Sequence, residues 1–88
     1  MVIQLHDDDT NRPKFIAREA ITKVYSNTDN RTVVEADSWF FASETVAEVI
    51  ALWTAPARTI GNEPILTLKA ISPDFLAKCK AITAKELP

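Results

Sequence analysis

The chain of 88 residues has one cysteine, one glycine and one histidine, and each scarcity narrows what the protein can be. Cys79 has no second cysteine to pair with, which excludes an intrachain disulfide and favours a reducing, cytoplasmic setting. No apolar run approaches the length of a membrane span. Residues 1–5 are too short for the apolar core of a signal peptide. We therefore expect a cytoplasmic protein that does not contact a membrane.

Strong charge of one sign is also missing. The net charge is -2, with nine acidic and five basic side chains in residues 1–55 and three acidic and five basic in residues 56–88. Neither part clusters enough Lys and Arg to neutralise phosphates, which disfavours nucleic acid as a partner. With one glycine, the turns must depend on Asn, Asp and Ser.

The first part of the sequence is a succession of short segments that resemble β-strands. Runs of apolar, β-branched and aromatic residues alternate with polar turns, a pattern typical of half-buried strands. The strands are expected over residues 2–6, 14–17, 21–25, 31–36 and 39–42. No helical pattern separates them, so short antiparallel connections are expected.

After residue 42 the spacing of the apolar residues changes to that of a helix. Ser43 is the expected N-cap, with Glu44 in the first turn, where the helix dipole favours an acid. An apolar stripe follows at helical spacing, formed by Val46, Val49, Ile50 and Trp53. Pro56 is expected to end the helix.

The last third of the sequence predicts a smaller structural unit of one strand and one helix. Residues 56–64 read as a linker that holds the only glycine, and residues 65–70 as a strand. Ser72, Pro73 and Asp74 form a strong helix start, because they supply a cap, a proline at the first position and an acid in the first turn. The apolar face of this helix is expected at Phe75, Leu76, Cys79 and Ile82.

Together these elements predict an α+β fold: an antiparallel β-meander of four to five short strands packed against two α-helices in a two-layer sandwich. The chain is expected to be a single domain over residues 1–88, with the meander and first helix in 1–55 and a strand–helix extension in 56–88. Whether the extension packs on its own chain or on a neighbouring one stays open.

The order of these segments carries a resemblance. It rests on residues 2–5, 15–16, 20–21, 32–34, 40–41, 43–44 and 46–50. Over residues 1–53 the chain resembles the small flagellar and swarming motility proteins of the FlbD/SwrD type. It is also similar to short phage-encoded proteins of unknown function, through residues 3–8 and 13–17. The segment from residue 56 has no counterpart in the motility proteins, which favours the phage-like alternative. Neither resemblance implies a catalytic site or a cofactor.

One acidic cluster invites a metal-site interpretation. Asp7, Asp9 and Asn11 have the spacing that opens a calcium-binding loop, but Arg12 stands where such a loop needs glycine. Arg18 stands where it needs its closing glutamate. We therefore expect no metal, but a solvated turn whose Asx side chains bond to the backbone.

Enzymatic chemistry has little support. His6 beside an aspartate could act as a base and its orienting group. No nucleophile is placed by a motif, and Cys79 falls on an apolar helix face, where a thiol is usually inert. We expect no enzyme and no cofactor.

Three consecutive aromatic residues are the most distinctive surface feature. Alternation along a strand puts Phe40 on one face of the sheet and Trp39 with Phe41 on the other. The second face is either covered by the C-terminal helix or free to contact a partner. Stacking on single-stranded nucleic acid is disfavoured by the nearby acids Glu35, Asp37 and Glu44.

The leading hypothesis is a small, non-enzymatic protein-interaction module, phage or prophage encoded, that acts in the bacterial cytoplasm. It binds a protein partner or itself, as a homodimer for example. The partner contacts are expected at Trp39, Phe41, Asp7, Asp8 and Asp9. One alternative is an acidic inhibitor of a host nucleic-acid-binding machine, which would use residues 7–9 with Glu35 and Asp37. The other is nucleic-acid binding through Lys78, Lys80 and Lys85 on the C-terminal helix.

Overall fold

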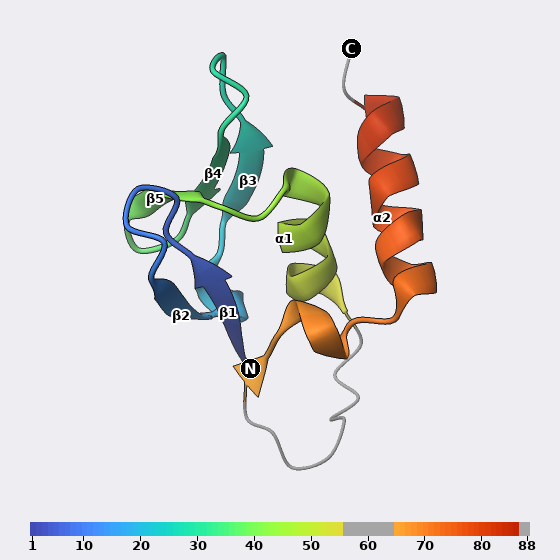
Figure 1. Cartoon of the computed structure of the whole chain (residues 1–88), viewed down its shortest axis with the longest axis horizontal. Coiled ribbons are helices and arrows are strands. Elements are labelled where there is room, and N and C mark those ends of the chain that lie inside the picture. The colour runs from blue at the N-terminus through green and yellow to red at the C-terminus, as the bar shows by residue number, and fades with distance from the viewer. Residues whose placement is uncertain (56–64, 87–88) are drawn as a thin grey trace.

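Six short strands and two α-helices are formed by residues 1–55 and 65–86 (Figure 1). The computed structural model describes residues 1–55 and 65–86, with side chains described up to residue 83. The strands form two three-stranded sheets, in the orders β2-β1-β6 and β3-β4-β5. The predicted α+β class, with short, mostly antiparallel strands packed against two helices, is confirmed. The sheet is divided in two where a single one was expected.

The first sheet is built on an antiparallel pair. β1 (Val2–His6) pairs with β2 (Pro13–Ala17) over its full length, from Val2 opposite Ala17 to His6 opposite Pro13. Period-two alternation buries Ile3 and Leu5 on one side of β1. These two side chains are wholly buried and form one wall of the core.

The second sheet is an antiparallel meander of β3 (Lys23–Ser26), β4 (Thr32–Glu35) and β5 (Trp39–Ala42). Val33 lies opposite Tyr25 on one side and Phe41 on the other, and Val34 lies opposite Val24 and Phe40. The β3–β4 turn is closed by Asn27, whose Oδ1 accepts the backbone N–H of Arg31 at 2.9 Å. This register sets which side chains share a face of the sheet.

The chain leaves the first sheet through a short 3-10 turn, η1 (Arg18–Ala20), and β3 does not pair with β2. This part of the chain contacts α1 (Val46–Thr54). The Arg18 guanidinium donates to the carbonyl of Ala55 at 2.6 Å, beyond the end of α1, and Ile21 is buried in the core. The two sheets meet elsewhere, through an antiparallel bridge between Asp7 and Ala42.

Helix α1 begins two residues later than the cap prediction. Ser43 and Glu44 precede the helix, and Thr45 is the N-cap. The Thr45 hydroxyl accepts the N–H of Glu48 at 3.1 Å, while the Glu48 carboxylate accepts the N–H of Thr45 at 2.8 Å. This reciprocal capping box satisfies two helix-end donors, which a cap at Ser43 would not do. The predicted cap at Ser43 was therefore wrong.

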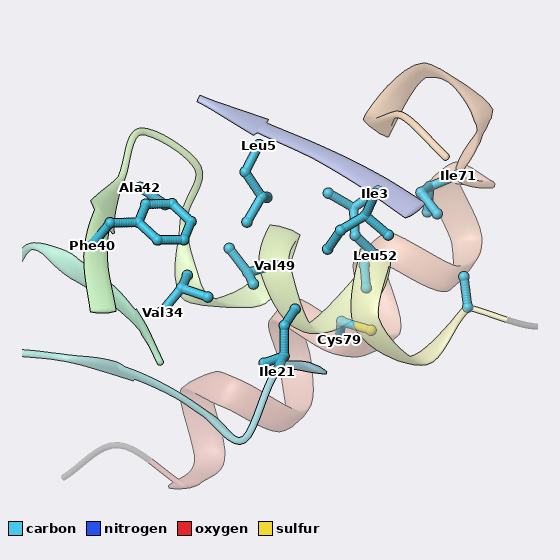
Figure 2. Close-up of a cluster of buried hydrophobic side chains, with 12 residues drawn as sticks. Ile3, Leu5, Ile21, Val34, Phe40, Ala42, Val49, Leu52, Ile71 and Cys79 are labelled. Atoms are coloured by element: carbon cyan, nitrogen blue, oxygen red, sulfur yellow. The ribbon is translucent and has the colours of Figure 1, made fainter. Parts of the chain in front are cut away.

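Helix α1 lies between the sheets and helix α2 (Figure 1). Val49 and Leu52 are wholly buried, and Ala47 and Ala51 are buried as well. The predicted stripe therefore includes only part of the buried surface, because the small alanines allow close packing beside it. The core cluster is drawn in Figure 2 and includes Ile3, Leu5, Ile21, Val34, Phe40, Ala42, Val49, Leu52, Ile71 and Cys79.

The C-terminal part packs on its own chain. β6 (Ile65–Leu66) pairs in parallel with Val2 and Ile3 of β1. The expected strand over 65–70 ends early, because the 3-10 turn η2 (Leu68–Ala70) follows and leads to Ile71, which is buried in the core. The predicted linker 56–64, with Pro56, lies outside the described residues.

Helix α2 (Pro73–Glu86) starts at the predicted proline. Cys79 is buried and Phe75 and Leu76 are partly buried against the core. Ile82 was expected on the same face but is 58% exposed, because it lies beyond the part of α2 that packs against the core. Within residues 1–55 and 65–86, neither helix has the length and apolar character needed to cross a membrane.

Candidate functional site

The outer face of the β3-β4-β5 sheet gathers aromatic side chains from two strands. Tyr25, Val33 and Phe41 share one row across the sheet, and the next row contains Glu35 and Trp39. All of them point away from the core, because Phe40 between Trp39 and Phe41 is the residue that is buried.

These aromatic rings remain accessible. The Trp39 side chain is 62% exposed and Tyr25 is 37% exposed. Trp39 contacts Phe41 edge to face, with ring centroids 5.1 Å apart and an interplanar angle of 77°. Helix α2 packs against α1 instead of this face. The C-terminal helix therefore does not provide the cover that was one of the two expected outcomes.

The side chains enclose a shallow hollow of about 240 Å³, which we name the aromatic groove. Val33 is 4% exposed and forms its floor, while Tyr25 stands on one side and Phe41 on the other. The lining residues are Tyr25, Asn27, Val33, Glu35, Trp39 and Phe41. A half-apolar hollow of this kind suits the side chains of a bound segment.

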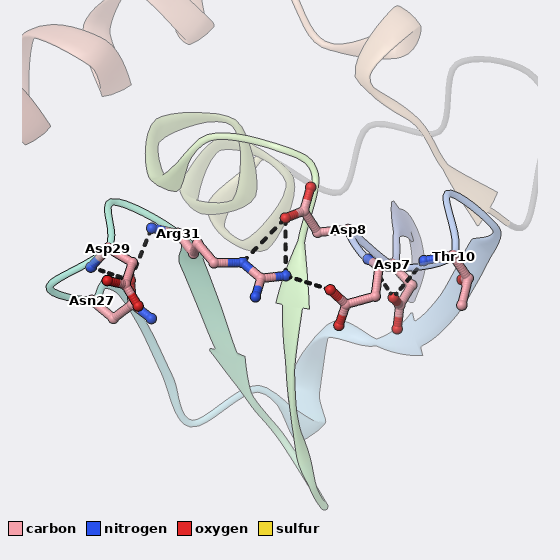
Figure 3. A network of polar contacts seen from close by, with 7 residues as sticks. Asp7, Asp8, Thr10, Asn27, Asp29 and Arg31 are labelled. Carbon is pink, nitrogen blue, oxygen red and sulfur yellow. Dashed lines mark hydrogen bonds and ion pairs between the residues drawn. The ribbon is translucent and has the colours of Figure 1, made fainter.

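Arg31 connects the aromatic groove to the acidic turn after β1. Figure 3 shows its contacts with that turn. Its guanidinium carbon lies 3.7 Å from the centre of the Phe41 ring. The same group forms ion pairs with Asp9 at 2.7 Å and with Asp8 at 3.1 Å. Hydrogen bonding to Asp9 raises the pKa of Arg31, and Asp8 adds to the effect. Arg31 is therefore held in place as a charged group against Phe41.

The acidic turn is organised by its own side chains. Asp7 Oδ1 accepts the backbone N–H groups of Asp9 at 2.9 Å and Thr10 at 3.2 Å. Asn11 adopts a left-handed conformation, with φ of 57°, which asparagine tolerates well. In the part of the chain that the structure describes, no three His, Cys, Asp or Glu side chains gather as metal ligands would. The turn matches the expected Asx arrangement.

The structure thus brings together both sets of predicted contact residues. Asp8 and Asp9 meet Arg31, and Arg31 stacks on Phe41 beside Trp39. Asp7 stabilises the turn that presents them. No local sequence pattern indicates this connection, because Arg31 lies 23 residues from Asp8 and 22 residues from Asp9.

Sequence reasoning missed a buried carboxylate. Glu44 is 7% exposed, and its Oε2 lies 2.7 Å from Nδ1 of His6 while its Oε1 accepts the His6 backbone N–H at 2.9 Å. From the sequence we considered an aspartate beside His6, and the structure places the Glu44 carboxylate there instead. The sequence does contain a signal for this: Thr45 and Glu48 have the Thr-x-x-Glu spacing of a capping box. That spacing predicts a helix that begins after Glu44, so Glu44 is not a first-turn residue and can contact another part of the chain.

A hollow of about 310 Å³ lies beside this pair, lined by Gln4, His6, Glu44, Thr67, Leu68 and Lys69. A histidine oriented by a carboxylate has the arrangement of a general base. Cys79 lies elsewhere, in the core, and burial raises the pKa of its thiol. A protonated, enclosed thiol is a poor nucleophile, so Cys79 cannot act with His6.

The lysines of α2 form no concentrated patch among the described side chains. Lys78 and Lys80 are exposed. The side chain of Lys85, the third lysine of that hypothesis, lies outside the described ones.

Comparison with protein-family models, with curated proteins and with solved structures gives no match to this chain. The resemblances to motility proteins of the FlbD/SwrD type and to small phage proteins therefore stay predictions.

Proposed function

We propose that the protein is a small, non-enzymatic protein-interaction module whose contact surface is the aromatic groove. The observation that carries this proposal is the 62% exposure of Trp39, a side chain that most proteins keep largely from water. Tryptophan and tyrosine dominate the binding energy of protein interfaces, because each offers a large rigid surface with a hydrogen-bond donor.

The surroundings of Trp39 support this role. Phe40 holds the strand of Trp39 on the core, and Phe41 contacts the Trp39 ring. Arg31 stacks on Phe41 and is itself held by two carboxylates. A contact surface that is already ordered loses little conformational entropy on binding, which favours affinity from a small area.

The alternative hypotheses draw less support. An acidic inhibitor would present the carboxylates of Asp8 and Asp9 to a basic protein, but both are paired with Arg31. Nucleic-acid binding would depend on Lys78 and Lys80, a small number of phosphate contacts. Phage or prophage origin and action in the bacterial cytoplasm remain part of the proposal, on the grounds of the single cysteine and the sequence resemblance.

The experiment compares three proteins: wild type, Trp39→Ala and Phe15→Ala. Phe15 is 55% exposed on β2, outside the aromatic groove, so its variant is a matched control for loss of an exposed aromatic ring. Each protein is used to capture partners from a bacterial lysate, and its solution mass is measured by light scattering at several concentrations.

Wild type and Phe15→Ala are expected to retain the same partner or to self-associate to the same degree, and Trp39→Ala to lose that association. Equal behaviour of all three proteins in both measurements would refute the proposed contact surface.

A further inference from the structure

We propose that the aromatic groove binds a proline-rich segment of a partner protein in polyproline II conformation, with a basic side chain of that segment beside Glu35. This inference rests on the interaction function proposed above and adds the chemistry of the partner. It follows from the width, the donors and the charge of the groove.

The width of the groove suits a single extended chain. Tyr25 and Phe41 are two strands apart in the same row, with Val33 between them as the floor. Neighbouring strands are spaced about 4.8 Å apart, so the backbones of β3 and β5 that carry the two aromatic walls are roughly 10 Å apart. An α-helix with its side chains measures about 10–12 Å across and would rest on the rims. A polyproline II chain is slimmer, and its rings can reach the floor.

Addition of the segment as a further β-strand is blocked on one side of this sheet. The carbonyl of Phe41 on β5 already accepts the backbone N–H of Asp8 at 2.9 Å, and Ala42 forms the bridge to Asp7. The other edge is β3, which pairs only with β4 among the described strands and carries only Tyr25 of the three groove aromatics. The face of the sheet carries all three rings and offers side chains and no backbone ladder. A ligand bound there has to bring its own extended conformation.

The donors in the groove match the needs of such a chain. A polyproline II segment has no internal hydrogen bonds, so its carbonyl oxygens seek external donors. Trp39 and Tyr25 are exposed and supply an indole N–H and a phenolic O–H. Proline rings pack well against aromatic faces, and aromatic-lined grooves are a recurrent site for proline-rich segments.

The charge of the groove selects a basic flank. Glu35 lies in the row of Trp39 and lines the groove, and within residues 1–55 and 65–86 it forms no ion pair. Of the nearby cations, Arg31 is paired with two carboxylates. Lys23 lies opposite Glu35 on β3, but its ammonium stands over the ring of Tyr25 at 4.9 Å and forms no ion pair with Glu35. An Arg or Lys of the bound segment can therefore pair with Glu35, whereas a phosphate would be repelled by it.

The small size of the groove gives a further reason. A hollow of about 240 Å³ holds only a few side chains, so little binding free energy is available to order a flexible peptide. A proline-rich segment is extended before it binds and loses less entropy. The groove is therefore better matched to this class than to a segment that must fold on binding.

The test is a titration of ¹⁵N-labelled full-length protein followed by NMR, which resolves the indole N–H signals of Trp39 and Trp53. The probe is an oligoproline peptide with one arginine at each end. A peptide of equal length with glycine and serine in place of proline, and the same two arginines, is the first control. An oligoproline peptide with glutamate at each end is the second.

The arginine-flanked oligoproline is expected to shift the Trp39 indole signal in a saturable manner and to leave Trp53 unmoved. Trp39→Ala should weaken binding about tenfold or more, as loss of a central tryptophan does at other interfaces, and Phe15→Ala should bind as wild type. Glu35→Gln should remove the preference for the arginine-flanked over the glutamate-flanked peptide. That variant leaves the aromatic rings intact, so its effect reports on charge alone.

Equal binding of the glycine–serine control, or an unmoved Trp39 signal at millimolar oligoproline, would overturn the inference. If that occurs while capture or self-association still depends on Trp39, the proposed interaction function stands and only the partner chemistry is refuted. If both fail, the interaction function is refuted as well.

Discussion

One carboxylate, that of Glu44, binds both the side chain and the backbone of His6. Glu44 Oε2 lies 2.7 Å from Nδ1 of the His6 ring, and Oε1 accepts the His6 backbone N–H at 2.9 Å. The pair fixes the end of β1 to the segment before α1, at the side of β1 that has no strand partner there.

Loss of the Glu44 carboxylate should destabilise the fold. Glu44→Ala leaves the backbone N–H of His6 without its acceptor, and the free energy of unfolding should fall by about 3 kcal/mol. Glu44→Gln keeps one acceptor oxygen and should cost about half as much. Chemical denaturation followed by circular dichroism measures both. Glu19→Gln, at an exposed ion pair, is the control and should change the stability little. A loss for Glu44→Ala no larger than for this control would show that the contact is unimportant for stability.

Adjacent aromatic residues on β5 should respond in opposite ways to truncation. Phe40 is 6% exposed and lies in the core, so Phe40→Ala should lower the free energy of unfolding by about 3–4 kcal/mol. Trp39 points outward, so Trp39→Ala should change it by no more than about 1 kcal/mol. Urea denaturation of the two variants provides the comparison. A large loss for Trp39→Ala would mean that its ring supports the fold, and the interaction experiments would then need a more conservative variant such as Trp39→Phe.

The position of the α1 cap gives a third prediction. Thr45→Ala removes the hydroxyl that accepts the N–H of Glu48, and should cost about 1 kcal/mol. Ser43→Ala removes the residue that the sequence pattern favoured as cap and should be nearly neutral, because its side chain is exposed and precedes the helix. Thermal unfolding of the two single variants distinguishes the caps. The reverse order of effects would restore Ser43 as the N-cap.

Cys79 should make the stability depend on alkaline pH. Burial raises the pKa of its thiol above the ordinary value of 9.0, so the unfolded chain loses this proton at lower pH than the folded one. The contribution is fully present below pH 9 and is lost as the pH rises through the folded pKa. The stability advantage of wild type over Cys79→Ala, measured by urea denaturation from pH 7 to 10, should therefore shrink above pH 9. A constant advantage across that range would contradict the burial of an ionisable thiol.

Local features of this fold could be predicted well from the sequence. The strands follow from period-two alternation and the second helix from its Ser-Pro-Asp start, and both signals involve neighbouring residues only. The outward direction of Trp39 follows from the same alternation, because its neighbour Phe40 is buried in the core and successive side chains of a strand point to opposite faces.

Features that depend on distant partners could not be predicted. The turn between the two sheets contains Arg18, whose guanidinium donates to a carbonyl 37 residues away. The burial of Glu44 depends on His6, 38 residues away, and an acid before a helix is more commonly a solvated first-turn residue. Arg31 likewise gains its role from the fold, through the turn at Asp8 and Asp9. No spacing rule in a single sequence connects such residues.

The parallel pairing of β6 with β1 has a consequence for how the chain acquires its structure. Ile3 pairs with Leu66, and Ile71 and Cys79 belong to the same core, so the first sheet is completed only by contacts between residues far apart in the sequence. Contacts of this kind require closure of a long loop, which makes them slow to form. The hairpins β1–β2 and β3–β4 are local and can form before the ribosome releases the last third of the chain. Until α2 arrives, the side of α1 that it covers stays open to water, and this is the interval in which the nascent protein is most exposed to aggregation.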